Sequence, residues 1–308
     1  MIIKWRTTPI EIHVLEALTR RLPRCDRRIE EDLAFCQKGY EGEKKVDRFT
    51  NSLLKNNFTI LHDVYIQHNG ASFQIDTLII GPYCIFVVEI KNYAGEVTFD
   101  FNLNQFTREL NGKLTGFRNP IIQATTNSIL LTEWLTDHEI SDVPIYSLVA
   151  LSDPSTILKI LPENSEFPNE VMHGEYLAQY ILKEKGNPHG YLHQKIGAVI
   201  LNECGTFNFD YKHKYKIECK DILCGVQCPT CGRLGMKRIH NKWICEKCSI
   251  TSAIAHQSAL TDYLLLIKPW ITNSECMRFL GFNSKNVATK LLKEQKLKYD
   301  KDRRRWHL

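Results

Sequence analysis

Apolar and polar residues follow a strand-like pattern in the first half of the chain. The segment FTILHDVYI is followed by HNGA, then by FQIDTLII, GPY and CIFVVEIKN. Runs of β-branched and aromatic residues that are separated by Gly, Pro and Asn are typical of strands joined by tight turns. We therefore predict three consecutive strands that form an antiparallel meander.

Apolar residues at helical spacing precede this meander. The segment IEIHVLEALTRRLP predicts a helix that ends at Pro23, and a second helix is expected over about residues 42–54. Val46 and Leu53 lie on the inward stripe of the second helix, and Glu43 extends that stripe by one turn toward the N-terminus. Glu43 is thus expected to face the sheet.

Two more helices and one more strand follow the meander. Asn119 as N-cap and Pro120 at the first helical position predict a helix in NPIIQATTNSILLTEWL. The segment VPIYSLVAL predicts a strand, and HGEYLAQYILKEKG predicts a helix that Gly186 ends. This order of elements is typical of an α/β fold in which helices flank a mixed central sheet.

Three charged residues, Asp76, Glu89 and Lys91, interrupt the apolar strands. A tight turn at Pro82 and Tyr83 pairs residues whose numbers sum to 165, so that Asp76 is expected directly opposite Glu89. Glu89 and Lys91 share a face, since strand side chains alternate. Two carboxylates this close repel each other unless a cation lies between them, and oxygen ligands select a hard ion such as Mg²⁺ or Mn²⁺. An edge-exposed Glu–Lys pair on a solvated face is the alternative.

The charged residues stand in segments that resemble the nuclease-related domain (NERD) family, which has the PD-(D/E)XK nuclease-like fold. These segments are GEKKV, FQIDTLII, VVEIKNYAG and NPIIQA, and the resemblance covers roughly residues 1–185. The proline of the PD signature is absent, because Ile75 precedes Asp76, but this difference does not remove a ligand.

The resemblance implies metal-dependent cleavage of phosphodiester bonds. Asp76, Glu89 and Lys91 match the core signature, with the two carboxylates as ligands of Mg²⁺ or Mn²⁺. Lys91 is suited to position the attacking water or to counter the charge that builds on phosphorus. Glu43 and Gln123 match the family by motif and complete the set of expected catalytic residues. A capping or helix-surface role remains the alternative for these two.

Basic residues are concentrated in the last third of the 308-residue chain. Residues 1–210 contain 20 Lys and Arg against 27 Asp and Glu, whereas residues 211–308 contain 20 against 8. This asymmetry is typical of a segment that binds a polyanion, and nucleic acid, DNA before RNA, is the expected partner. Solvated Lys and Arg faces without a partner are the alternative.

Four of the 11 cysteines form two tight pairs, Cys228 with Cys231 and Cys245 with Cys248. Two C-x₂-C pairs with 13 residues between them are typical of a zinc site. Four thiolates complete a closed tetrahedral shell, which leaves no position for a substrate. A structural Zn²⁺ is therefore expected.

The segment after Ala255 predicts three helices followed by two short strands. This order resembles a winged helix-turn-helix. The candidate nucleic-acid-binding residues are Lys285, Lys290 and Lys293 on the third helix and Arg303, Arg304 and Arg305 at the wing. A helical protein-docking domain is the alternative.

The sequence thus predicts three parts: a nuclease-related domain with an N-terminal helical extension (residues 1–210), a zinc ribbon (211–254) and a winged helix-turn-helix-like module (255–308). The predicted function is metal-dependent hydrolysis of nucleic acid, and a non-catalytic or partner-dependent adaptor that keeps the nuclease fold is the alternative. No segment approaches the ~18–20 apolar residues that span a bilayer, and residues 1–42 lack a run of signal-peptide length, so that a cytoplasmic protein without a membrane partner is expected.

Overall fold

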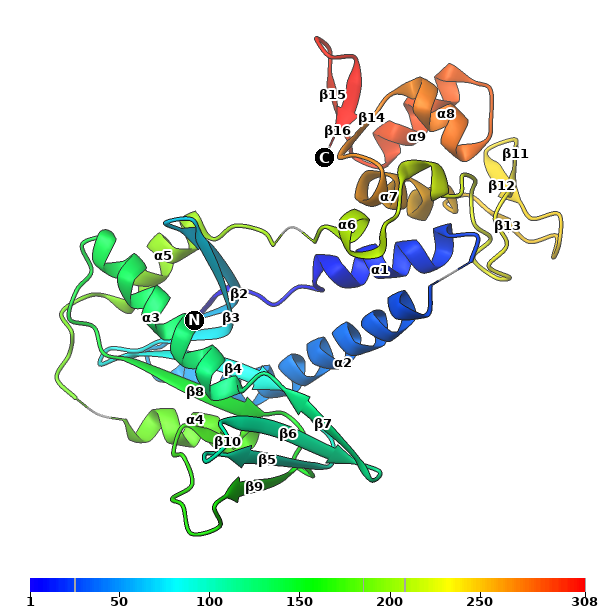
Figure 1. Cartoon of the computed structure of the whole chain (residues 1–308). Coiled ribbons are helices and arrows are strands. Elements are labelled where there is room, and N and C mark those ends of the chain that lie inside the picture. Colours follow the sequence, from blue (N-terminus) through cyan, green and yellow to red (C-terminus); the bar gives the residue numbers. More distant parts are fainter. Residues whose placement is uncertain (25, 185, 208, 308) are drawn as a thin grey trace. The chain divides into compact units, whose positions relative to one another are not determined.

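The computed structural model describes residues 1–24, 26–184, 186–207 and 209–307. The chain divides into two compact units. The first comprises Met1–Thr8 and Gln37–Asn208, and the second comprises Pro9–Cys36 and Phe209–Leu308. Figure 1 shows the labelled helices and strands of both units.

A six-stranded sheet forms the centre of the first unit. Its strands lie in the order β1-β2-β3-β4-β8-β10. They are β1 (Ile2–Lys4), β2 (Thr59–His68), β3 (Ala71–Ile80), β4 (Ile85–Lys91), β8 (Ile145–Leu151) and β10 (Val171–His173). Strands β2, β3 and β4 are antiparallel neighbours, whereas the β1–β2, β4–β8 and β8–β10 pairs are parallel. The predicted meander and the mixed central sheet are confirmed.

Helices cover both faces of this sheet (Figure 1). They are α3 (Pro120–Asp137), α5 (His193–Glu203), α4 (Gly174–Lys183), the 3₁₀ helix η1 (Asn51–Lys55) and the C-terminal part of α2 (Arg27–Thr50). Helices α3 and α5 pack in the apolar layer that contains Val87, and α2, η1 and α4 pack in the layer that contains Phe86 and Val88. Successive side chains of β4 therefore enter opposite layers, as the two-residue period of a strand requires.

The first unit also contains a second, four-stranded sheet that the sequence does not predict. Its strands, in the order β7-β6-β5-β9, are β5 (Glu96–Asp100), β6 (Gln105–Leu110), β7 (Lys113–Phe117) and β9 (Ile157–Leu161). Val97, Phe99 and Phe106 are buried in an apolar cluster with Val149 of β8. The sequence does not predict this sheet because each strand is short and places few apolar residues between charged ones, so that its period is weak.

The second unit contains elements from both ends of the chain. They are α1 (Ile10–Arg21), the N-terminal part of α2, α6 (Tyr211–Tyr215), η2 (Cys219–Asp221), β11 (Lys237–Ile239), β12 (Lys242–Ile244), β13 (Thr251–Ser252), α7 (His256–Leu266), β14 (Trp270–Ile271), α8 (Asn273–Leu280), α9 (Lys285–Glu294), β15 (Lys298–Asp300) and β16 (Arg305–His307). The three predicted helices and the final hairpin are present, and a short strand that the sequence did not predict, β14, pairs with β16. Across the described ranges, no helix has the length and apolar content needed to cross a bilayer.

One apolar core serves the cysteine-rich segment and the helices that follow it. Trp243 of β12 is fully buried, and its indole N–H donates to Nδ1 of His256 on α7 at 3.2 Å. The Trp243 ring also contacts Phe282 edge to face. Cys228 and Cys245 belong to the same cluster. The predicted zinc ribbon and the predicted winged-helix-like module are therefore packed together within one compact unit.

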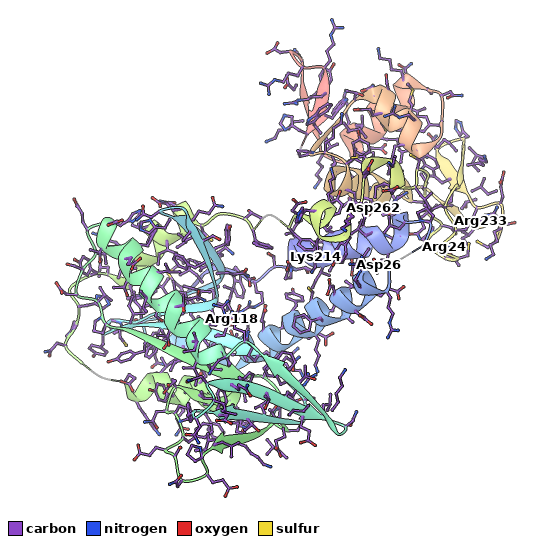
Figure 2. All side chains as sticks on the ribbon, in the orientation of Figure 1. Arg24, Asp26, Arg118, Lys214, Arg233 and Asp262 are labelled. Atoms are coloured by element: carbon purple, nitrogen blue, oxygen red, sulfur yellow. The ribbon has the colours of Figure 1, made fainter. Side chains whose placement is uncertain are left out.

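The N-terminal helix also belongs to this unit. The sequence predicts α1 as an extension of the nuclease-related domain, whereas its Val14, Leu15 and Leu18 side chains are buried in the core of the second unit. Arg21 of α1 is fully buried and pairs with Asp262 of α7 at 2.8 Å; Figure 2 labels Asp262. Helical spacing shows which face of a helix is apolar, but it does not show which element covers that face.

Candidate functional site

The register of β3 and β4 explains how Asp76 meets the neighbouring strand. Paired residue numbers sum to 165 along the ladder, which ends at Thr77 opposite Val88. The next pair would be Asp76 and Glu89. Instead of a backbone pair, the Asp76 carboxylate accepts a hydrogen bond from the backbone N–H of Ile90 at 2.8 Å. The side chain of Asp76 thus replaces the ladder at this point and is held against β4.

Strand β2 is irregular at the same level. Its ladder with β3 continues on both sides of Asp63 and Asp76 but omits these two residues. Asp63 has a left-handed backbone, with a φ of 52°, which aspartate tolerates better than most residues. Leu61 and Val64 lie in the same apolar layer, although a regular strand would put them on opposite faces. The distortion therefore releases two acidic residues of adjacent strands from regular pairing.

Glu89, Lys91 and Gln123 are brought together at the end of β4. Lys91 Nζ donates to Glu89 Oε1 at 2.6 Å and to Gln123 Oε1 of α3 at 3.3 Å. The Glu89 side chain is 2% exposed, so that the alternative of a solvated surface pair does not describe it. Asn127, one turn further along α3, donates to the backbone carbonyl of Gln74 and fixes the helix against β3.

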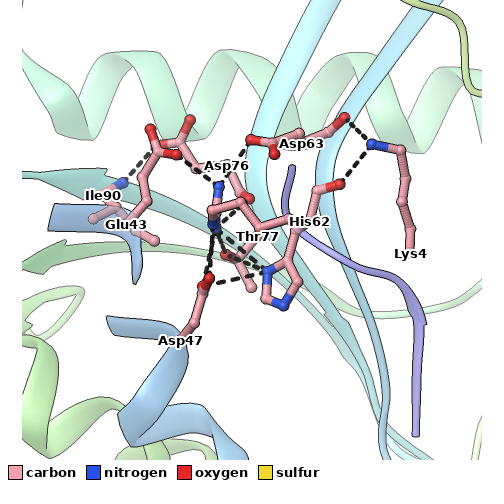
Figure 3. Close-up of polar contacts among 9 residues, drawn as sticks. Lys4, Glu43, Asp47, His62, Asp63, Asp76, Thr77 and Ile90 are labelled. Carbon is pink, nitrogen blue, oxygen red and sulfur yellow. Dashed lines mark hydrogen bonds and ion pairs between the residues drawn. The ribbon is translucent and has the colours of Figure 1, made fainter. Parts of the chain in front are cut away.

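Glu43 reaches the same edge because of the residue before it. A Cβ atom at Gly42 would lie 2.5 Å from Cβ of Asn92 and 2.7 Å from Oγ of Ser152. These two residues directly follow β4 and β8, so that the missing side chain of Gly42 lets α2 approach the carboxyl ends of both strands. Figure 3 shows Glu43 beside Asp76.

The carboxylates at this edge repel one another. Burial, and next the charge of Asp76, raise the pKa of Glu89 well above its ordinary value, although Lys91 opposes the shift. Burial and Asp76 also raise the pKa of Glu43, in this case against Arg6. Buried carboxylates that destabilise one another in this way suit a divalent cation, and their hard oxygen atoms fit Mg²⁺ or Mn²⁺.

Arg6 is a central residue of this site that the sequence analysis missed. Its side chain is 3% exposed and donates to Glu43 at 2.8 Å and to Asp63 at 2.8 Å. It also contacts both carboxylate oxygens of Asp47, at 2.8 and 3.1 Å. Burial would lower the pKa of Arg6, but the hydrogen bond to Asp47 and the charges of Glu43 and Asp63 outweigh it and raise the pKa. No sequence motif surrounds Arg6; only the pairing of β1 with β2 brings it to the site.

Arg118 is a second basic residue that sequence analysis missed. It is exposed and directly precedes Asn119, the N-cap of α3 (Figure 2). Its positive charge is close enough to Glu89 to oppose the rise in pKa that burial and Asp76 cause. An exposed guanidinium at this position is suited to contact a phosphate group.

The four predicted zinc ligands form a compact cluster. The Sγ atoms of Cys228 and Cys248 lie 3.6 Å apart, as do those of Cys231 and Cys245, and all four lie within 4.8 Å of one another. Thiolates about 2.3 Å from a tetrahedral zinc ion are roughly 3.8 Å apart, so that the cluster fits this metal. None of the four is in a disulfide. Within the described ranges, the carboxylates at the sheet edge do not form a group of three ligands with this spacing.

The predicted nucleic-acid-binding residues differ in their surroundings. The exposed ones are Lys285, Lys290, Lys293, Arg303 and Arg304. Arg305 is partly buried, pairs with Asp300 at 3.7 Å and lies over the ring of Trp270 at 5.1 Å. Arg305 therefore stabilises the β15–β16 hairpin, and the two exposed arginines are the better candidates for contact with a polyanion.

The fold and the sheet edge define a mixed α/β domain with a carboxylate–lysine site. Residues 38–152 match the Nuclease-related domain family (NERD). The match includes Glu43, Asp76, Glu89, Lys91 and Gln123, so that the resemblance predicted from the sequence is confirmed for this part of the chain.

A protein of Bacillus anthracis described as uncharacterized is also similar to this chain. It is 29% identical over 130 residues, which make up 42% of this chain and 59% of that protein. The similarity thus spans less than two thirds of the relative's length. No solved structure matches the chain.

Proposed function

We propose that the first unit is a metal-dependent nuclease that hydrolyses phosphodiester bonds of nucleic acid, with DNA as the favoured substrate. The observation that carries the proposal is the pair of buried-edge carboxylates, Asp76 and Glu89, beside the ammonium group of Lys91. The match to the nuclease-related domain supports the same chemistry. In this proposal Asp76 and Glu89 hold Mg²⁺ or Mn²⁺, which when bound polarises the phosphate and lowers the pKa of a coordinated water.

The protein groups around this pair have separate roles in the proposal. Lys91 orients the attacking water or neutralises the charge that develops on the phosphate oxygens, which preorganised cations stabilise. Gln123 accepts a hydrogen bond from Lys91 and keeps its ammonium group at the site. Arg118 contributes a positive charge on the solvent side, where a phosphate backbone can approach.

The first test of this function is divalent-metal-dependent cleavage of single-stranded, duplex and branched DNA and of RNA. Wild type is expected to cleave in Mg²⁺ or Mn²⁺, and Lys91→Ala is expected to lower the rate by roughly 10²–10³-fold, because a preorganised charge is removed from the reacting phosphate. Lys45→Ala is the matched control, since Lys45 is an exposed lysine within the same matched region. Equal rates for wild type and Lys91→Ala would contradict the proposed role, and binding without any cleavage would favour the adaptor.

The second unit is proposed to bring the enzyme to nucleic acid. Its last elements follow the order α7, β14, α8, α9, β15 and β16, with the sheet order β14-β16-β15. This arrangement favours a winged helix, in which the third helix and the hairpin contact DNA. The exposed basic residues on these two elements include five of the predicted contacts: Lys285, Lys290, Lys293, Arg303 and Arg304.

Replacing Arg303 and Arg304 together with Ala is expected to weaken DNA binding and to reduce its salt dependence. Each phosphate contact contributes roughly −0.9 to the slope of log K against log salt on duplex DNA, so that two contacts account for about 1.8. The full chain is titrated with labelled duplex at several salt concentrations. The control removes two arginines that are exposed and already paired, Arg27 with Glu31 and Arg28 with Asp26. An unchanged slope in the wing variant would point to a protein-docking role for this module.

A further inference from the structure

We infer that Arg6 is a built-in cation of the proposed nuclease site, which therefore takes one divalent metal ion, between Asp76 and Glu89. In this inference Glu43, Asp47 and Asp63 form ion pairs with Arg6 and do not ligate a second metal ion. The inference rests on the proposed function and specifies the metal stoichiometry of the same site. Arg6 is a positioning residue here, since it acts through the carboxylates that it holds.

The guanidinium group of Arg6 uses all its hydrogen-bonding capacity inside the site. A guanidinium offers five N–H donors. Nε and Nη2 bind the two carboxylate oxygens of Asp47, and Nη1 binds Glu43 Oε2 and Asp63 Oδ1. Nη2 also donates to the backbone carbonyl of Asp76 at 2.9 Å and to Thr77 Oγ1 at 2.8 Å. A lysine ammonium at this position could not reproduce the planar, bidentate contact with Asp47.

The backbone on both sides of the network holds Arg6 in place. Strand β1 pairs in parallel with β2, and Lys4 donates to the backbone carbonyls of His62 and Asp63 at 2.8 Å each. Lys4 thus binds the same strand as Arg6 but touches no carboxylate oxygen in these contacts. A divalent ion could take the place of Arg6 only by displacing a side chain that is 3% exposed, and the removed guanidinium would leave three partly buried acids.

The acidic residues of the site differ in the basic residue with which each forms an ion pair. Glu89 is paired with Lys91, and Glu43, Asp47 and Asp63 are paired with Arg6. Within the described ranges, Asp76 has no ion pair, and its carboxylate accepts the N–H of Ile90. Asp76 is therefore the acid that still lacks a cation. It stands next to Glu89 in the strand register, which leaves one place for one divalent ion.

The test counts bound Mn²⁺ on the zinc-loaded full chain by electron paramagnetic resonance, which detects the unbound ion. Wild type is expected to bind one Mn²⁺ per chain. Asp76→Asn is expected to lose that ion. Glu43→Gln should change the Mn²⁺ affinity by less than roughly 10-fold, which is the smallest loss typical when a residue that hydrogen-bonds to a metal ligand is removed. Arg6→Ala is expected to bind a second Mn²⁺ in place of the lost guanidinium, and the double variant Arg6→Ala with Glu43→Gln should return to one.

Lys45→Ala is the control, because it removes the positive charge of an exposed side chain on α2, and it should remain at one Mn²⁺. Two ions on wild type, or an equal loss of affinity in Glu43→Gln and Asp76→Asn, would overturn the inference and leave the proposed function standing. A folded Arg6→Ala variant that still binds one Mn²⁺ would also overturn the inference and leave the proposed function standing. If Arg6→Ala does not fold, the wild-type count and Glu43→Gln decide the question. Wild type that binds no Mn²⁺ would remove the proposed metal site together with the inference.

Discussion

Asp76→Asn and Glu89→Gln are each expected to abolish metal-dependent cleavage while the first unit stays folded. Both changes keep the size of the side chain and remove one negative charge, and an amide oxygen at position 76 can still accept the N–H of Ile90. A catalytic metal stabilises the transition state by several kcal/mol, and each ~1.4 kcal/mol is a factor of ten in rate. The expected loss is therefore at least roughly 10²–10³-fold, measured as initial rates in saturating Mn²⁺.

The melting temperature of the Asp76→Asn variant shows whether Asp76 stabilises the fold or destabilises it in the absence of metal. Asp76 raises the pKa of both Glu43 and Glu89, which means that its charge repels theirs. Asp76→Asn should therefore raise the melting temperature in buffer without Mg²⁺ or Mn²⁺, and the buffer must contain no chelator so that zinc is retained. Asp142→Asn is the control, because Asp142 is exposed and has a left-handed backbone that Asn tolerates. Wild-type cleavage rates in both site variants would remove the proposed metal site.

Cys228→Ser is expected to release the zinc and to unfold more than the cysteine-rich segment. Zinc binding supplies about 10–16 kcal/mol of apparent free energy in small zinc-dependent folds, so that loss of one thiolate ligand is a large effect. Cys228 and Cys245 share an apolar core with Trp243, which donates a hydrogen bond to His256 of α7. Loss of the metal should therefore also loosen the helices that carry the proposed nucleic-acid-binding residues.

Elemental analysis of the native protein measures the zinc content, which is expected to be about one ion per chain, and near-ultraviolet circular dichroism measures the packing around Trp243. Cys224→Ser provides the control, because Cys224 is an exposed free cysteine outside the four-cysteine cluster. Native protein without zinc, or Cys228→Ser with unchanged zinc content and unchanged aromatic signal, would refute the structural role of the metal.

Several features of the first unit follow from short-range sequence patterns. The tight turn and the alternation of apolar residues predict the register of β3 and β4, because a one-residue slip would move every apolar side chain to the wrong face. The predicted N-cap Asn119 accepts the backbone N–H of Ile121 at 2.9 Å. The predicted inward stripe through Val46 and Leu53 is buried. Each of these predictions depends on residues that are close in the sequence.

Other features required the folded chain. Helix α2 begins at Arg27, well before the predicted start near Gly42, since Ile29 and Leu33 pack in the core of the second unit. The strands β5, β6, β7 and β9 form a sheet although their individual patterns are weak, because pairing satisfies backbone groups that no single segment could satisfy. The close approach of α2 to the ends of β4 and β8 depends on Gly42, whose role is visible only from its neighbours.

Sequence patterns alone predict the antiparallel meander of β2, β3 and β4, the spacing of the four cysteines and the placement of Asp76, Glu89 and Lys91 on facing strands. These are consequences of local geometry, namely turn length, side-chain alternation and ligand spacing. The entry of Arg6 into the acidic site and the packing of α1 against α7 in the second unit are visible only in the folded chain. Arg6 is 70 residues from Asp76, and α1 lies more than 200 residues from its partner. Contacts over such separations depend on how whole elements bury their apolar faces, and no local period of the sequence records that choice.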